Sequence, residues 1–243
     1  MDNGDASIDE FIARRWDDAK RELEDRDPGY VHSLETAARP SLQGIYLPPV
    51  VLKGRLPKAW TELLETCIDL RWTIELLRCA AEGLRDEEYE GLDDVQAGRR
   101  ASYHLTSWIH HLYAVSEKVK KLITLTCKLY LDDARRKRIR QKHHKLLDDR
   151  LGKTLLKARI PLAHGAGGRG TVMRSVTELG GWEPAVTLKI MPITFLESSN
   201  RAEADLRPKW HRQRVDQTRG VEVLIGQILA SLETELSSNS EPC

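Results

Sequence analysis

Two side chains of this sequence, Arg159 and His164, have the residue types and spacing for chemistry on RNA. They lie in the stretch Lys157-Ala-Arg-Ile-Pro-Leu-Ala-His-Gly165, where a leucine-faced helical pattern gives way to a glycine-rich segment. A guanidinium is always charged, and its donors match the geometry of a phosphate. An imidazole can accept and return a proton near neutral pH. The pair therefore supplies two of the groups that metal-free RNA cleavage needs.

The same spacing occurs in two other pairs, Arg99 with His104 and Arg138 with His143. The first of these lies early in a long predicted helix rather than at its end, which favours ordinary surface placement. Position along the chain therefore favours Arg159 and His164 as the catalytic pair.

Three residues of the long predicted helix share one face, because His104, Trp108 and His111 are separated by steps of four and three. This face can point towards the motif helix and support its side chains. A core-facing tryptophan flanked by two hydrogen-bonded histidines is the favoured interpretation. No carboxylate or cysteine completes a metal-ligand set with His104, His110 and His111, so we expect neither a metal nor another cofactor.

A strongly basic run precedes the candidate motif. Seven of the eleven residues from Arg135 to Lys145 are Lys or Arg, while the net charge of the whole chain is only +1. Any attraction to nucleic acid must therefore be local, and RNA phosphates would exploit it through counterion release. The alternative is a helix end that protrudes into solvent. The candidate RNA-binding residues are Arg135, Arg136, Lys137, Arg138, Arg140, Lys142 and His143.

Composition narrows the class of protein. An apolar fraction of 40% with a charged fraction of 31% is typical of a soluble helical protein. The four cysteines have neither zinc spacing nor a disulfide framework, so we expect reduced, mostly buried thiols. No signal peptide or membrane span is apparent. These features predict a cytoplasmic protein.

Helical periodicity defines the elements that must position the motif. Apolar residues recur at helical spacing over 58–84 and 94–130, and the length of the second segment suggests an antiparallel bundle. A leucine-faced helix leads into Arg159. The last helix is expected from about 202 to 236, with an interruption near Pro208.

The regions outside this bundle have a different character. Ser7-Ile-Asp-Glu10 has the form of a capping box that starts a helix ending at about Leu23, before Asp27-Pro-Gly29. Prolines over 40–57 predict an extended arm, which is also a possible partner-binding segment. We expect 1–57 to form an N-terminal region and 58–236 the bundle, with an insertion of mixed helix and strand at about 166–200. Residues 237–243 are expected to be a disordered tail.

The order of these elements resembles the HEPN superfamily of small helical bundles, many of which are RNases of toxin–antitoxin and phage-defence systems. The likeness rests on two long helices, a third that ends in Arg-x4-His-Gly, and a closing helix, over roughly 58–236. The family commonly has a polar residue after the arginine, whereas Ile160 and Pro161 follow Arg159 here.

The resemblance implies that Arg159 holds the scissile phosphate and that His164 is the general acid or base when a ribose 2′-hydroxyl attacks phosphorus. It also implies a homodimer that brings two motifs together, no metal, and possible pairing with a cognate antitoxin or regulator. The alternative is a non-catalytic bundle that binds RNA, a nucleotide or a protein partner.

Overall fold

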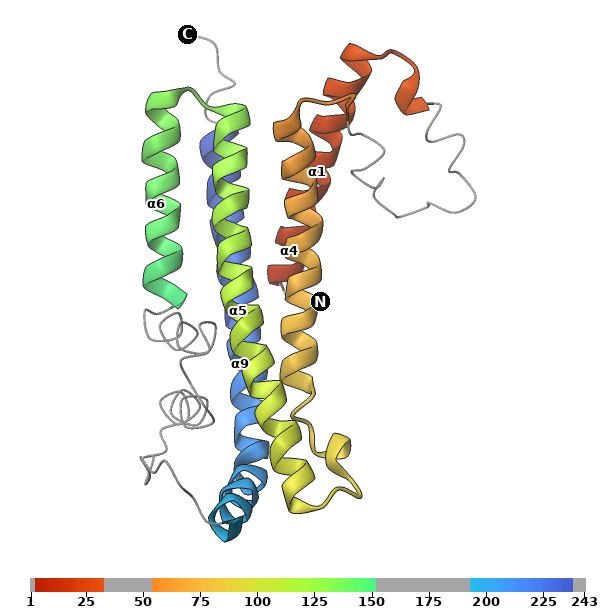
Figure 1. Ribbon diagram of the computed structural model, residues 1–243. Coiled ribbons are helices and arrows are strands. Elements are labelled where there is room, and N and C mark those ends of the chain that lie inside the picture. Colours follow the sequence, from red (N-terminus) through yellow and green to blue (C-terminus); the bar gives the residue numbers. More distant parts are fainter. Residues whose placement is uncertain (1–2, 33–53, 152–192, 238–243) are drawn as a thin grey trace. The chain divides into compact units, whose positions relative to one another are not determined.

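The computed structural model describes residues 3–32, 54–151 and 193–237, and every element in these ranges is helical. No strand occurs among them, which confirms the prediction of an all-α fold. The elements are α1 (Asn3–Arg26), α4 (Lys58–Glu82), the short 3-10 helix η1 (Asp86–Tyr89), α5 (Asp94–Tyr130), α6 (Asp133–Leu151) and α9 (Ile193–Ser237) (Figure 1).

The two central helices agree closely with the sequence pattern. α5 has the predicted bounds, and α4 ends two residues before the predicted end. Their apolar stripes are buried, because a period of 3.6 residues places these side chains on one face of each helix. The buried positions include Leu63, Leu64, Leu70, Ile74 and Leu77 of α4 and Leu105, Trp108, Leu112, Val115, Val119 and Leu122 of α5.

The predicted start of α1 is wrong. The helix already includes Asn3, so Ser7 lies within it and does not cap its first turn. The Ser7 hydroxyl instead donates a hydrogen bond to the main-chain oxygen of Gly226 in α9, at 3.1 Å. The Ser7 hydroxyl therefore makes a tertiary hydrogen bond and not the local helix cap that the sequence predicts. The predicted stop is confirmed, since Gly29 has a positive φ of 83° just beyond the helix.

The expected interruption of the last helix is also wrong. α9 runs without a break from Ile193 to Ser237 and includes Pro208. A proline removes one main-chain hydrogen bond, but its φ is compatible with a helix, and the long flanks on both sides can maintain the structure. Residues 193–200, assigned to the mixed insertion, belong to this helix. The strand predicted within that insertion, most of the proline-rich arm and the tail from 238 lie outside the described residues.

The chain divides into two compact units. Unit 1 comprises Met1–Arg71, Lys118–Leu147 and Val223–Cys243, and unit 2 comprises Trp72–Glu117 and Asp148–Glu222. Each of α4, α5, α6 and α9 contributes residues to both units. This division differs from a boundary at residue 57, because α1 groups with segments of all four of these helices in unit 1.

Unit 1 combines antiparallel and parallel neighbours. α4 and α5 are antiparallel, since Asp69 pairs with Lys118 at 2.7 Å while the rings of Trp60 and Tyr130 meet edge to face at 5.7 Å. α1 and α9 are parallel, because the Ser7–Gly226 contact is followed along both helices by a contact between Arg15 and Glu233. The five described helices that contribute to unit 1 thus share a core although they are not all antiparallel.

Unit 2 joins α4 to α9 in antiparallel orientation. Arg78 Nε donates to Glu222 at 2.6 Å, and the ring of His211 lies 3.3 Å from the carboxylate of Glu82. Beyond α4, the Tyr89 hydroxyl donates to the main-chain oxygen of Gly83 at 2.9 Å. A small apolar cluster closes this end of α4 and the start of α5, formed by Leu84, Tyr89, Ala97, Ala101 and Leu105, with Leu92 packed against it.

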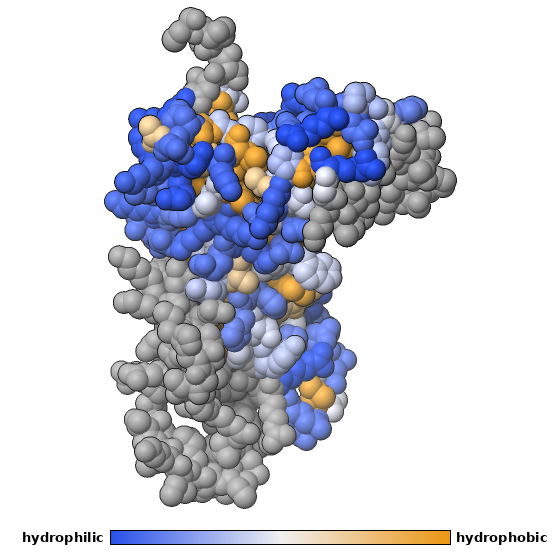
Figure 2. Space-filling view, turned by 45° about the horizontal axis from the view of Figure 1, so that its top comes forward, coloured by the Kyte–Doolittle hydropathy of each residue, from blue (hydrophilic) through white to orange (hydrophobic). Residues whose placement is uncertain are grey.

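The visible surface is mainly hydrophilic, and hydrophobic residues show only as small separate areas in the face drawn in Figure 2. No described helix combines the length and hydropathy that crossing a membrane requires. Among the described cysteines, Cys67 and Cys127 are buried and Cys79 is exposed, and all three are free thiols. Burial raises the pKa of Cys67 to about 12 and that of Cys127 to about 11, so both thiols stay protonated near neutral pH.

Candidate functional site

The predicted catalytic pair, Arg159 and His164, lies outside the described residues. α6 leads towards it in the sequence and is described as far as Leu151. The part of the candidate site open to structural description is therefore the basic run on α6, together with the residues on α5 that the sequence placed on one face.

α6 has two distinct faces, although seven of the eleven residues from Arg135 to Lys145 are Lys or Arg. Ile139, His143 and Leu147 are buried and follow one another at intervals of four residues. This stripe packs the helix against the rest of unit 1. α6 is therefore neither a free helix end nor a cationic rod, and its cations are confined largely to the opposite side.

The outward side of α6 carries most of the predicted RNA-binding residues. Lys137, Arg138, Lys142 and Lys145 are exposed, while Arg135, Arg136 and Arg140 are half-buried. Arg136 is engaged within the chain, because its guanidinium pairs with Asp133 at 2.7 Å and donates to the main-chain oxygen of Leu131 at 3.2 Å. Lys142 pairs with Glu235 of α9.

Three exposed cations of α6 have no such partner. Within the described part of the chain, Lys137, Arg138 and Lys145 form no ion pair and no side-chain hydrogen bond, and they are separated along the helix by one and seven residues. Residues three and four apart on a helix are surface neighbours, so the seven-residue step joins Arg138 to Lys145 on one side. These three side chains form a cationic surface that is free to meet an external anion.

The ring of His143 does not belong to this surface. Its side chain is fully buried and lies 3.6 Å from the carboxylate of Glu235. Burial is the main cause that lowers the pKa of His143, while Glu235 opposes the shift. A neutral imidazole in the core cannot contact a phosphate in this conformation. The prediction that His143 is an RNA-binding residue is therefore wrong for this structure. The sequence could not show this burial, because four Lys or Arg residues lie within five positions of His143.

The three residues assigned to one face of α5 have different environments in unit 2. Trp108 is fully buried, as its core interpretation predicted. His104 is half-buried, and its ring lies so close to Gly83 that a Cβ added there would meet it at 2.3 Å. His111 is also half-buried. Burial lowers the pKa of both histidines, so they are mainly neutral near pH 7.

Trp108 contacts a residue that the sequence did not single out. The guanidinium of Arg214 lies over its ring, 4.9 Å from the centroid, and only 1% of Arg214 is exposed. The indole N–H donates to Thr218 at 3.0 Å, and the Thr218 hydroxyl donates to the main-chain oxygen of Arg214 at 2.8 Å. A four-residue step on α9 joins Arg214 to Thr218, but nothing in that spacing marks the arginine as buried.

A second buried arginine, also missed from the sequence, lies in unit 1. Arg15 Nη2 donates to Glu233 at 2.5 Å, and Nη1 lies 3.4 Å from Asp18. Its guanidinium also stacks over the rings of Phe11 and Tyr130, at 5.0 and 4.5 Å from their centroids. Two carboxylates therefore oppose its charge.

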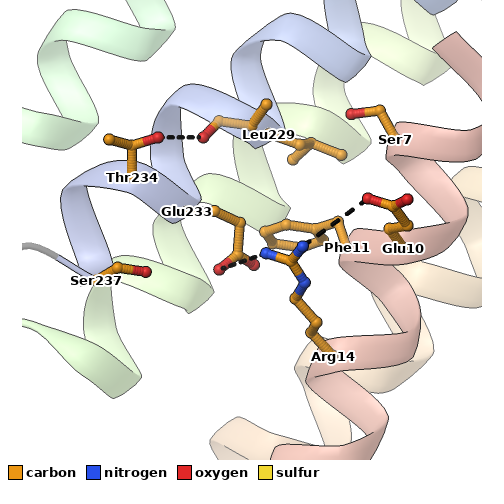
Figure 3. Close-up of a pocket in the computed structure, with 9 residues that line it drawn as sticks. Ser7, Glu10, Phe11, Arg14, Leu229, Glu233, Thr234 and Ser237 are labelled. Atoms are coloured by element: carbon orange, nitrogen blue, oxygen red, sulfur yellow. Dashed lines mark hydrogen bonds and ion pairs between the residues drawn. The ribbon is translucent and has the colours of Figure 1, made fainter. Parts of the chain in front are cut away.

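A groove of about 470 Å³ lies beside this arginine, between α1 and α9 (Figure 3). Its lining residues are Ser7, Glu10, Phe11, Arg14, Leu229, Ala230, Glu233, Thr234 and Ser237. Figure 3 shows Arg14 reaching between Glu10 and Glu233, which it meets at 3.8 and 3.9 Å. Since Ser7 and Thr234 also donate to main-chain oxygens, the principal polar groups of the groove already have partners within the chain.

The described residues contain no group of three or more His, Cys, Asp or Glu side chains arranged to hold a metal ion. Comparisons with known proteins found no family model, no curated protein and no solved structure that match the chain.

Proposed function

We propose that the chain is a HEPN-like, metal-independent endoribonuclease in which α6 guides RNA towards Arg159 and His164. The proposal is carried by the cationic surface of Lys137, Arg138 and Lys145, three exposed side chains without an ion pair among the described residues. This surface lies on the helix that precedes the motif in the sequence. Its charge suits a phosphate backbone, which would release condensed counterions on binding.

The chemistry assigned to the motif is transesterification, which forms a 2′,3′-cyclic phosphate and releases the downstream RNA fragment. His164 accepts the proton of a ribose 2′-hydroxyl as its oxygen attacks the adjacent phosphorus. The bond from phosphorus to the 5′-oxygen breaks, which leaves a 2′,3′-cyclic phosphate, and the 5′-oxygen takes up a proton to become a hydroxyl. Arg159 stabilises the charge that develops on the phosphate oxygens. Proton transfer by a positioned residue typically contributes about 10²–10⁴-fold.

Assembly follows from the same resemblance. One subunit would supply half of the site, and a homodimer would place a second His164 where it can protonate the leaving 5′-oxygen. A nuclease of this kind would belong to a toxin or phage-defence system and would be held in check by a cognate antitoxin or regulator.

The nuclease is tested by incubating the purified chain with single-stranded RNA in EDTA. We expect products with 2′,3′-cyclic phosphate ends, and loss of cleavage in His164→Ala and in Arg159→Ala. Arg99→Ala is the matched control, because Arg99 belongs to a pair with the same spacing, and it should cleave like the wild type. Undiminished cleavage by His164→Ala would remove the mechanism.

RNA binding is tested separately with a variant in which Lys137, Arg138 and Lys145 are all changed to Gln. If the three side chains each meet a phosphate, the salt dependence of binding should become less steep by about 2, at about 0.7 for each contact to a single strand. The control changes Arg14, Arg21 and Arg26 of α1 to Gln, which removes the same charge elsewhere in unit 1. An equal loss of binding in both variants would contradict a specific role for α6.

A non-catalytic RNA-binding bundle is the second candidate, favoured by Ile160 and Pro161 at the positions after Arg159. It predicts that the α6 variant loses RNA binding while the wild type releases no cyclic phosphate from any RNA tested. The two experiments together therefore separate binding from cleavage.

A further inference from the structure

Arg214 in unit 2 is a buried cation whose charge is not opposed by an acidic side chain of the described residues. No described carboxylate forms an ion pair with it. Burial alone lowers its pKa to about 10, so the guanidinium remains charged near neutral pH. An isolated charge in a protein interior is costly, because water no longer solvates it. Such a group normally has an ionic partner.

The acidic residues packed nearby in unit 2 are engaged with other cations. Glu222, two turns further along α9, accepts from Arg78 at 2.6 Å. Glu82 of α4 pairs with Arg85 and lies 3.3 Å from the ring of His211, one turn before Arg214. Glu222 and Glu82 therefore pair with cationic side chains other than Arg214.

Two of the three guanidinium nitrogens of Arg214 lack a hydrogen-bond partner. Its Nη1 donates to the side-chain oxygen of Gln217 at 2.5 Å, while Nε and Nη2 are buried without a hydrogen bond. These two N–H groups lie along one edge of the planar guanidinium. That edge is the fork with which arginine binds two oxygens of a phosphate or carboxylate. A water molecule could satisfy one N–H group but would leave the charge unopposed.

The neighbours of Arg214 hold the fork in place. Trp108 lies against the face of the guanidinium, and the negative face of an indole ring attracts a cation placed over it. Thr218 fixes the indole through its N–H and also bonds to the main chain of Arg214. Gln217 holds the remaining terminal nitrogen. The guanidinium is therefore oriented before any anion arrives, which reduces the ordering that binding requires.

We propose that the Nε–Nη2 edge of Arg214 binds a phosphate-type oxyanion, either free phosphate or a phosphate of a nucleic acid. Both N–H groups donate to oxygens of the anion while Trp108 stacks on the guanidinium. Because both donors are covered in this conformation, the anion reaches them only when neighbouring side chains move. The site does not depend on the endoribonuclease, since neither Arg159 nor His164 takes part in it.

The test measures thermal unfolding of the full chain in chloride buffer and in phosphate at equal ionic strength. For a site half-filled at about 1 mM, linkage predicts that 100 mM phosphate raises the melting temperature by about 5–10 °C. Arg214→Met should keep only the smaller rise that phosphate gives by its general exclusion from protein surfaces. Arg15→Lys is the control for a buried arginine of unit 1 and should retain the full difference between the two buffers.

Arg214→Lys covers the case in which Arg214→Met does not fold. A lysine keeps the charge but offers no two-donor edge, so its phosphate response should be much weaker than that of the wild type. An independent readout is the ¹H–¹⁵N signal of the Arg214 Nε–H group, identified by its absence from Arg214→Lys. This signal should shift on titration with inorganic phosphate.

A third arm replaces phosphate with a short 2′-O-methyl RNA, which cannot be cleaved through its 2′-position. A response to RNA but not to free phosphate, lost in Arg214→Lys, assigns the site to nucleic-acid phosphates. A response to free phosphate, lost in the same variant, assigns it to a small anion. The proposal is overturned if the Arg214 Nε–H signal is unmoved by both ligands, or if Arg214→Met retains the full wild-type rise.

Discussion

The two buried arginines make an instructive comparison, because they have similar burial and aromatic contacts but opposite electrostatic surroundings. Arg15 in unit 1 is 3% exposed, lies over Phe11 and Tyr130, and meets the carboxylates of Glu233 and Asp18. Arg214 in unit 2 is 1% exposed, lies over Trp108, and meets no described carboxylate.

This difference in acidic neighbours indicates a structural role for Arg15 and a binding role for Arg214. Arg15 also has two buried nitrogens, Nε and Nη1, without a hydrogen bond, so unsatisfied donors alone do not mark a binding site. What distinguishes Arg214 is that, among the described residues, no carboxylate opposes its charge and no acceptor meets its donor edge. A cation neutralised inside the fold stabilises that fold, whereas one left without an anion is poised for a partner from elsewhere.

The largest effect is expected from Arg15→Met. Removing this guanidinium leaves Glu233 and Asp18 with only the exposed arginines Arg14 and Arg21 as ionic partners. Breaking a buried ion pair typically costs about 3–5 kcal/mol of unfolding free energy. Urea denaturation at pH 7 measures the loss. Arg14→Met, which removes an exposed neighbour, should cost no more than about 1 kcal/mol.

Arg214→Met provides the opposing half of this comparison. In phosphate-free chloride buffer it should be at least as stable as the wild type, since the substitution removes an unopposed buried charge and keeps an apolar side chain over Trp108. If Arg214→Met loses as much stability as Arg15→Met, the distinction between the two arginines collapses.

The next largest effect is expected from Gly83→Ala, which tests whether the α5 face that carries Trp108 is tightly packed in unit 2. Gly83→Ala should lower the unfolding free energy by about 1–3 kcal/mol, because its new Cβ would overlap the ring of His104. Urea titration provides the measurement. The double variant with His104→Ala should recover part of the loss.

Gly220→Ala is the matched control in the same unit, because nothing lies within 4 Å of a Cβ added there. Alanine is the better residue in a helix interior, so this variant should gain about 0.5–1 kcal/mol. A loss at Gly220 as large as that at Gly83 would show that the effect does not come from His104.

The smallest effect concerns pH and the buried base of unit 1. Burial lowers the pKa of His143 in the folded state, so the unfolded chain binds more protons as the pH falls below about 6.5. Stability linked to His143 is therefore present above that pH and is lost on acidification, at no more than about 1.4 kcal/mol per pH unit for one proton. Denaturation curves at several pH values between 7 and 5 measure this slope.

His143→Leu should have a shallower slope, because leucine fits between Ile139 and Leu147 and does not titrate. The unfolding free energy of this variant will still depend on pH, since His104 and His111 in unit 2 also have lowered pKa values. His32→Leu, which changes an exposed histidine, should leave the wild-type slope unchanged. An unaltered slope in His143→Leu would show that its ring is not kept neutral by burial.

The sequence by itself determined where the central helices lie, although not the start of α1 or the full length of α9. The apolar spacing of Leu63, Leu64, Ile74 and Leu77 is a local property, so the face of α4 that becomes buried can be read without knowing its neighbours. The same reasoning gave the bounds of α5 and the stop after α1. It also located the basic run on α6, because charge is a property of the residues themselves.

Only the tertiary structure decided how polar side chains are used. Ser7 fits a helix cap by its local pattern, but its hydroxyl bonds to Gly226, more than two hundred positions away. His143 fits a cationic run, yet the packing of α6 places it in the core. Arg15 and Arg214 look like ordinary surface arginines until their aromatic and acidic neighbours are known. The physical reason is that a polar group's role depends on which partners reach it through space, and spacing along one helix does not contain that information.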